Sequence, residues 1–307
     1  MSALISDRDL VTLVSANGLW RADVHPVGAS LVALFYDDHE IVITPYSETF
    51  YAFAGATLAP WPNRLEDGTW IFGDKTLQHR INDERGHNSN HGLVFDRKFE
   101  VVRASQEEIV FQISLGEDAV YPFKVDITVS YHLTEQGLSQ SISATNKDSQ
   151  LVPIAFGAHP YLLLEDDSMV EINALQVYAK SSRGLPLAKM PIAESGLAKN
   201  GFNLARELEV DDCFVGLIEN ADSRYSTRVT RPGLNQTVEI WQDTEFDHLM
   251  LFAFRENGAE GRSALAVEPQ TAPANALRSH DDIVWISPGS TLSAAWGISI
   301  TEGIAND

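Results

Sequence analysis

The sequence predicts an all-β protein, built as a large antiparallel β-sandwich. Its apolar residues alternate with a period of two, and turn residues recur about every 8–12 positions, as in sandwiches of many short strands. Hydrophobic residues make up 44% of the 307 positions, enough for a sizeable core. Neither an internal repeat nor a Pro/Gly/Ser-rich linker divides the chain, so we expect residues 1–307 to form one domain.

In the first half of the chain, apolar segments flank short turns and predict hairpins. Residues 123–133 alternate most clearly, because Val125, Ile127, Val129 and Tyr131 fall on one face of an extended strand. The predicted pairs are residues 30–36 with 40–45, the two arms of 69–77 around Gly73 and Asp74, residues 98–103 with 109–114, and residues 123–133 with 138–145.

The second half continues the same pattern. Further strands are predicted at residues 226–230, 236–241, 248–254, 263–268, 283–287 and 291–300. Only two segments favour helix: residues 6–15, over one or two turns, and residues 272–279, which include Pro273.

The net charge argues against some classes of partner, and the cysteine count excludes an intrachain disulfide. The chain has 22 basic and 43 acidic residues, a formal charge of −21, which disfavours nucleic acid and anionic membrane surfaces. Cys213 is the single cysteine, so an intrachain disulfide is excluded. Without a long apolar run or a basic, apolar leader in the printed sequence, we expect a cytoplasmic protein. Either a monomer or a homodimer fits these features.

Two polar segments stand out from the strand pattern in the first third of the chain. Residues 55–64 end with Asn63 and Arg64 after two prolines, where a rigid loop could present both side chains, although a solvated surface loop is the simpler reading. The loop 82–96 is rich in Asn and contains His87 and His91. Its composition is typical of a binding loop or of a turn-rich connection. A metal held by the two histidines is disfavoured, because the intervening Asn residues and Gly92 argue against a helix.

Three later segments combine titratable side chains with unusual surroundings. His159 lies in an apolar run next to Pro160, where burial would shift its pKa and suit it to proton donation. Glu268 ends an apolar strand, so partial burial would raise its pKa and suit it to act as a general base. Asp211 and Asp212 are adjacent, and on an extended backbone only one of them can face a cleft.

Taken in order, these segments resemble the aldose 1-epimerase (galactose mutarotase) family. The matching positions are Asn63-Arg64, Asn90-His91-Gly92, His159-Pro160-Tyr161, Asp211-Asp212-Cys213-Phe214 and Glu268-Pro269-Gln270-Thr271. The resemblance implies a β-supersandwich fold and interconversion of the α and β anomers of free aldoses such as galactose and glucose, without a cofactor or metal.

The resemblance also implies a role for each residue. Glu268 would be the general base that takes the proton of the anomeric hydroxyl, and His159 the general acid that protonates the ring oxygen. Arg64, His91, Asp211 and Asn63 would bind the sugar. For the apolar face of the sugar, the sequence offers Trp61, Phe156, Tyr161 and Trp241 as candidates.

Some features leave alternatives open. The sequences NDERGHNSNHG and EPQTAPANAL resemble a bacterial epimerase-like subgroup more than the galactose enzymes, so the substrate could be a sulfonated or phosphorylated hexose. Arg80, Arg85 and Arg97 lie near the His91 loop and could neutralise such a group. A non-catalytic sugar-binding β-sandwich and a metal enzyme using His87, His91 and His159 are the other hypotheses.

Overall fold

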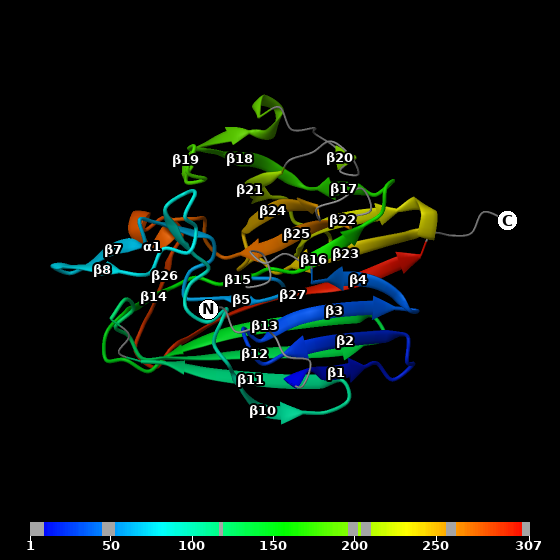
Figure 1. Cartoon of the computed structure of the whole chain (residues 1–307), viewed down its shortest axis with the longest axis horizontal. Coiled ribbons are helices and arrows are strands. Elements are labelled where there is room, and N and C mark those ends of the chain that lie inside the picture. Colours follow the sequence, from blue (N-terminus) through cyan, green and yellow to red (C-terminus); the bar gives the residue numbers. More distant parts are fainter. Residues whose placement is uncertain are drawn as a thin grey trace.

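The computed structural model describes residues 9–44, 53–116, 119–195, 202–203, 210–255 and 262–302. Within these ranges the chain is almost entirely β-structure, and the named strands pair antiparallel (Figure 1). Helical segments are short: α1 (Ala276–Ser279), η2 (Ile192–Glu194) and η3 (Pro232–Leu234). No helix of the described ranges is long and apolar enough to cross a membrane.

The larger sheet carries most of the segments that matter for the site. Its strands, in spatial order, are β1 (Val11–Val14), β2 (Trp20–His25), β3 (Ser30–Tyr36), β4 (His39–Ile43), β16 (Tyr161–Leu164), β25 (Ser263–Gln270), β24 (His248–Arg255), β21 (Asp211–Leu217), β18 (Ala174–Lys180) and β19 (Pro186–Pro191). The short strands β5 (Thr57–Leu58) and β15 (Gly157–Ala158) join it beside β25.

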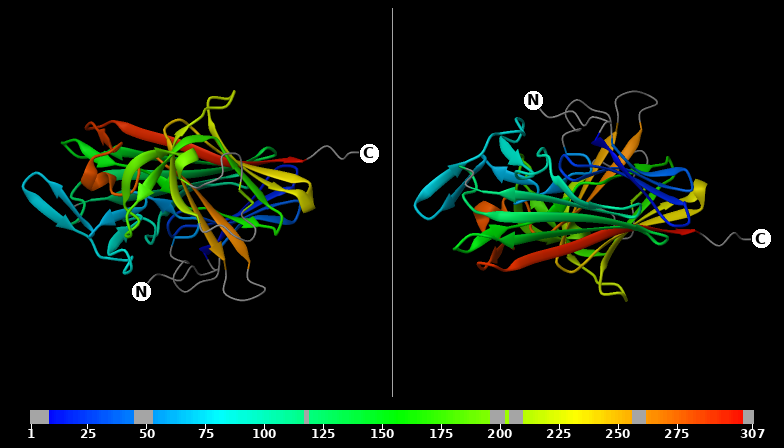
Figure 2. Two further views of the ribbon diagram at one scale, coloured as in Figure 1. Left: turned by 90° about the horizontal axis from the view of Figure 1, so that it is seen from above. Right: turned by 90° about the horizontal axis from the view of Figure 1, so that it is seen from below.

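The second sheet faces the first across a shared apolar core, and Figure 2 views both layers from above and below. Its strands, in spatial order, are β10 (Glu100–Ala104), β11 (Glu108–Leu115), β12 (Val125–Thr134), β13 (Gly137–Asn146), β27 (Thr291–Glu302), β23 (Gln236–Gln242), β22 (Tyr225–Arg231), β17 (Met169–Ile172) and β20 (Phe202–Asn203). Three two-stranded ladders complete the described structure: β6 (Arg64–Glu66) with β9 (Asn88–Asn90), β7 (Thr69–Phe72) with β8 (Lys75–Gln78), and β14 (Val152–Ile154) with β26 (Val284–Ile286).

Alternation explains why the strongest strand predictions are confirmed. Along β12, the apolar residues Val125, Ile127, Val129 and Tyr131 are fully buried, whereas the polar residues between them are not. The hairpin of β7 and β8 turns at Gly73 and Asp74 as predicted, and it projects from one end of the molecule in every view (Figures 1 and 2).

Two local predictions are wrong. Residues 11–14 form strand β1 and not a helix, because β2 offers a full antiparallel register from Val11 opposite Val24. Residues 6–8 of the predicted helix lie outside the described residues. Strand β25 continues past Glu268 to Gln270. It tolerates Pro269 because, on the side away from β24, β16 pairs only up to Ala266 and β15 begins at Gln270.

Candidate active site

A short ladder joins the two polar segments from the first third of the sequence. Arg64 of β6 stands opposite Asn90 of β9, and the His91 N–H donates to the Asn63 carbonyl at 2.9 Å. Asn63 and His91 both have left-handed backbone, with φ of 58° and 68°. Such backbone is uncommon outside glycine and collects at functional sites. The ladder brings Asn63, Arg64 and His91 together.

The backbone also fixes the tautomer of His91. The N–H of Asn63 donates to His91 Nδ1 at 3.3 Å, so Nδ1 is the acceptor of the ring. Burial, together with the charges of His159 and Arg64, holds the His91 pKa well below its usual value. The imidazole is therefore neutral, and its proton lies on Nε2, the nitrogen left to donate to a ligand.

Glu268 and His159 form a buried contact at the centre of the pocket. His159 follows β15 and Glu268 lies on β25, and the pairing of β16 with β25 brings them together. His159 Nε2 is 3.3 Å from Glu268 Oε1, and the side chains are only 6% and 3% exposed. Burial raises the pKa of Glu268 to about 8 and lowers the pKa of His159 to about 4.

These two pKa values mean that the pair holds one proton over a broad range. Between about pH 4 and 8 the proton resides mainly on Glu268, facing a neutral imidazole. Because the atoms are within reach of each other, the proton can pass to His159 Nε2 and leave a carboxylate and an imidazolium. The pair can therefore remove one proton and deliver another in the same event.

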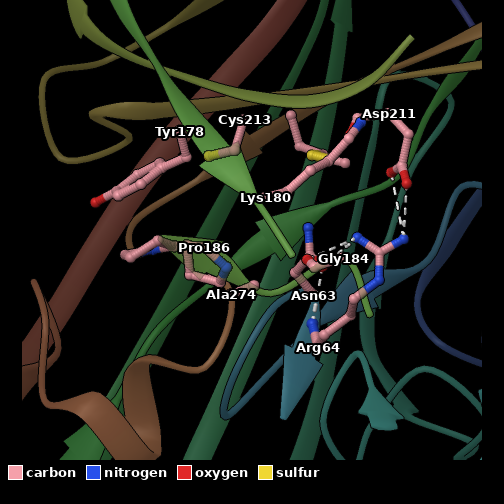
Figure 3. Close-up of a pocket in the computed structure, with 11 residues that line it drawn as sticks. Asn63, Arg64, Tyr178, Lys180, Gly184, Pro186, Asp211, Cys213 and Ala274 are labelled. Carbon is pink, nitrogen blue, oxygen red and sulfur yellow. Dashed lines mark hydrogen bonds and ion pairs between the residues drawn. The ribbon is translucent and has the colours of Figure 1, made fainter. Parts of the chain in front are cut away.

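An ion pair forms the opposite wall. Both oxygens of Asp211 accept from Arg64 Nη2, at 3.0 and 3.3 Å. Asp212 instead pairs with Lys180 at 2.9 Å. Asp211 is thus the member of the adjacent pair that lines the pocket. Figure 3 shows its ion pair with Arg64 from a neighbouring chamber, which both residues also line.

The six residues selected from the sequence line one pocket, which is partly open to solvent. They are Asn63, Arg64, His91, His159, Asp211 and Glu268. A second, smaller chamber continues past Arg64 and Asp211 toward Tyr178 and Cys213 (Figure 3).

Of the four aromatic candidates for the apolar face of the sugar, one lines the pocket and three do not. Tyr161 lines the pocket, but Trp61, Phe156 and Trp241 are absent from its lining. Trp61 is buried beneath the site, where its indole N–H donates to the Ser89 carbonyl, and Phe156 belongs to the core. Trp241 lies on β23 in the other sheet, with Arg224 over its ring.

The other basic and metal-ligating candidates lie outside the pocket. His87 is exposed and contacts Asp67, so it does not join His91 and His159. Within the described ranges, no cluster of three His, Cys, Asp or Glu side chains is arranged to hold a metal ion. Arg80 pairs with Asp96, and neither Arg80, Arg85 nor Arg97 lines the pocket.

The structure adds residues that the sequence reasoning missed. The Phe53 ring lies 4.6 Å from that of His91 and stacks at 6.4 Å on that of His159, which helps to keep both imidazoles dry. Gln270 donates to Glu268 Oε2 at 3.0 Å. Phe53 gave no distinguishing signal, but the spacing Glu-x-Gln on a strand places both side chains on one face and could have identified Gln270.

Fold and pocket together define a β-sandwich protein built around a buried carboxyl–imidazole pair. The aldose 1-epimerase family model matches residues 9–299, and the chain belongs to that family.

Known proteins extend the comparison. Uncharacterized protein YihR of Escherichia coli K12 is 27% identical over 287 residues, which is 91% of this chain and 89% of YihR. The crystal structure of the GalM/aldose epimerase homologue from Caenorhabditis elegans superposes with a TM-score of 0.81 at 21% identity, covering 96% and 99% of the two chains. That of a galactose mutarotase-like protein from Clostridium acetobutylicum gives 0.79 at 22% identity, covering 93% of each chain. These two likenesses show the fold.

Proposed function

We propose that the protein is a mutarotase that interconverts the α and β anomers of a free hexose. The observation that carries the proposal is the 3.3 Å contact between His159 and Glu268 inside a pocket that all six candidate residues line. Anomer exchange requires one proton to leave the anomeric hydroxyl and another to reach the ring oxygen, and a pair that shares one proton supplies both.

The reaction balances on these two groups. Glu268, as carboxylate, takes the proton from O1 while His159, as imidazolium, gives its proton to the ring oxygen. The bond between C1 and the ring oxygen breaks and the open-chain aldehyde forms. After rotation about C1–C2, His159 takes back the proton of the ring oxygen as it attacks C1, and Glu268 returns its proton to O1. The pair ends in its starting state.

The remaining residues hold the sugar. Because His91 presents a neutral Nε2–H, it suits a hydrogen bond to the ring oxygen, where charge changes during opening. Arg64 and Asp211 present a donor and an acceptor to hydroxyls at the other end of the ring. Asn63 steadies Arg64, because its Oδ1 accepts from the Arg64 N–H at 2.8 Å.

The test is to follow α-to-β conversion of freshly dissolved α-glucose and α-galactose by polarimetry or NMR. We expect faster equilibration with the wild-type protein, and a loss of about 10²–10⁴-fold in Glu268→Gln and in His159→Asn. Sulfonated and phosphorylated hexoses belong in the same panel, since they decide between neutral and anionic substrates. Sugar binding without any acceleration would instead identify a non-catalytic lectin-like protein.

A further inference from the structure

Gln270 is a polar neighbour of Glu268 that does not line the pocket. It is completely buried, and its Nε2 donates to Glu268 Oε2 at 3.0 Å. Glu268 and Gln270 are two residues apart on β25, so their side chains leave the sheet on the same face. Glu268 is therefore held at both oxygens, by His159 at Oε1 and by Gln270 at Oε2.

The bonding of Gln270 differs from that of a glutamine kept for stability. Gln140, which is equally buried on β13, uses both ends of its carboxamide: Nε2 donates to the Tyr131 hydroxyl and Oε1 accepts from Trp296 Nε1. Gln270 uses only its donor, because Oε1 has no hydrogen-bond partner among the described residues. A buried acceptor without a partner is costly, which favours a functional reason for retaining the residue.

We propose that Gln270 is a positioning residue of the reaction, which fixes Glu268 and biases the shared proton toward His159. This inference rests on the proposed function. A hydrogen bond from a carboxamide N–H stabilises a charged carboxylate much more than it stabilises a protonated carboxyl group. The bond from Gln270 thus favours the state in which Glu268 has lost its proton and His159 carries it. That state is the one that can begin ring opening.

Other charged and titratable groups also surround Glu268. Arg64 lowers the Glu268 pKa, while Asp211 raises it; Tyr161 and Cys213 also lie close enough to feel the charge of Glu268. Among these influences, burial acts most strongly, and the Gln270 hydrogen bond is the largest that opposes it. On the neighbouring strand, His248 stands opposite Gln270.

The inference predicts two linked changes in Gln270→Met, which keeps the size of the side chain and removes the donor. Loss of a hydrogen bond to a charged group corresponds to about one to two pKa units. We expect the upper limb of the kcat/KM–pH profile to move up by about that amount. The plateau should fall by the same factor, about 10- to 100-fold, because the productive proton arrangement becomes rarer by that factor. KM should change little.

Two further variants sharpen the test. Gln270→Glu keeps the shape and places a second carboxyl beside Glu268, so the upper limb should move further than in Gln270→Met; it also carries the test if the methionine variant does not fold. Gln140→Met is the matched control, because it removes a buried glutamine of the other sheet that does not line the pocket. We expect Gln140→Met to lower the midpoint temperature of unfolding and to leave both limbs of the kcat/KM–pH profile where they are in the wild type.

A direct titration makes the result independent of turnover. The Glu268 carboxyl carbon, followed by ¹³C NMR in wild type and in Gln270→Met, should titrate about one to two units higher in the variant. An unchanged titration overturns the role of Gln270, whether or not the wild type accelerates any sugar. Failure of the proposed function would look different, since then no aldose would be accelerated by the wild type while the titration still shifts.

Discussion

His159 Nε2 lies 3.3 Å from Glu268 Oε1, and both side chains are almost fully buried. An isolated buried charge is expensive, so the pair is stable as two neutral groups and reactive as two charged ones. Desolvation moves the two pKa values apart, to about 4 and about 8, and the contact lets one proton serve both residues. This relationship sets the pH range in which we expect activity.

The first prediction concerns that range. The pair gains a second proton below about pH 4 and loses its last proton above about pH 8, so kcat/KM should fall on both sides of a plateau. The measurement is the anomerisation rate from pH 3.5 to 9.5, corrected for the spontaneous rate in buffer alone. A profile that keeps rising above pH 9 would exclude the one-proton state as the active form.

The second prediction separates Asp211 from Asp212. Asp211→Asn removes the carboxylate that pairs with Arg64 in the pocket, so KM should rise by about tenfold or more with a smaller change in kcat. Asp212→Asn loses a comparable charge, but Asp212 does not line the pocket: it forms a partly exposed pair with Lys180 and accepts from the Asp211 N–H at 3.3 Å, a bond that an Asn oxygen can also accept. We expect its kinetics to stay within about twofold of wild type, and equal effects in the two variants would contradict the assignment.

Sequence reasoning could predict the fold because strands such as β12 bury one face more than the other. The alternation along β12, and along β13 from Leu138 onward, follows from that burial. The pocket residues could be predicted from the sequence for a different reason. Glu268 and His159 are titratable groups within apolar segments, and such placement is rare without a function.

The rest depends on contacts between distant segments. Asn88–Asn90 carries no β-branched or apolar signal, so nothing in the sequence indicated that β9 would pair with β6 and set His91 beside Arg64. The hydrogen bond from the Asn63 N–H that fixes the His91 tautomer is a backbone feature, and it is likewise invisible to side-chain patterns.

The third prediction tests how Arg64 is held. Gly184 has φ of +73°, and a Cβ built there would lie 2.7–3.0 Å from three atoms of the Arg64 guanidinium. Gly184→Ala should therefore displace Arg64 and raise KM severalfold, beyond the cost of the strained backbone. Gly18→Ala is the matched control, because Gly18 has φ of +75° and nothing within 4 Å of the added Cβ. Similar kinetics in both variants would show that Arg64 does not depend on Gly184.

The last prediction concerns stability. Because the folded-state pKa of Glu268 is raised to about 8 from a usual 4.5, the folded protein binds more protons than the unfolded chain between these values, and this group lowers stability as pH rises. His159, whose pKa falls to about 4 from 6.5, has the opposite effect, raising stability with pH only up to about 6.5. The net loss from the pair therefore lies between about pH 6.5 and 8.

Glu268→Gln removes the ionisable group, so its unfolding free energy should exceed that of wild type by an amount that grows to several kcal/mol by pH 8, at about 1.4 kcal/mol per pKa unit. Denaturant unfolding of both proteins at pH 5, 6.5 and 8 measures the difference. A gap that does not change with pH would mean that Glu268 is not desolvated in the folded protein.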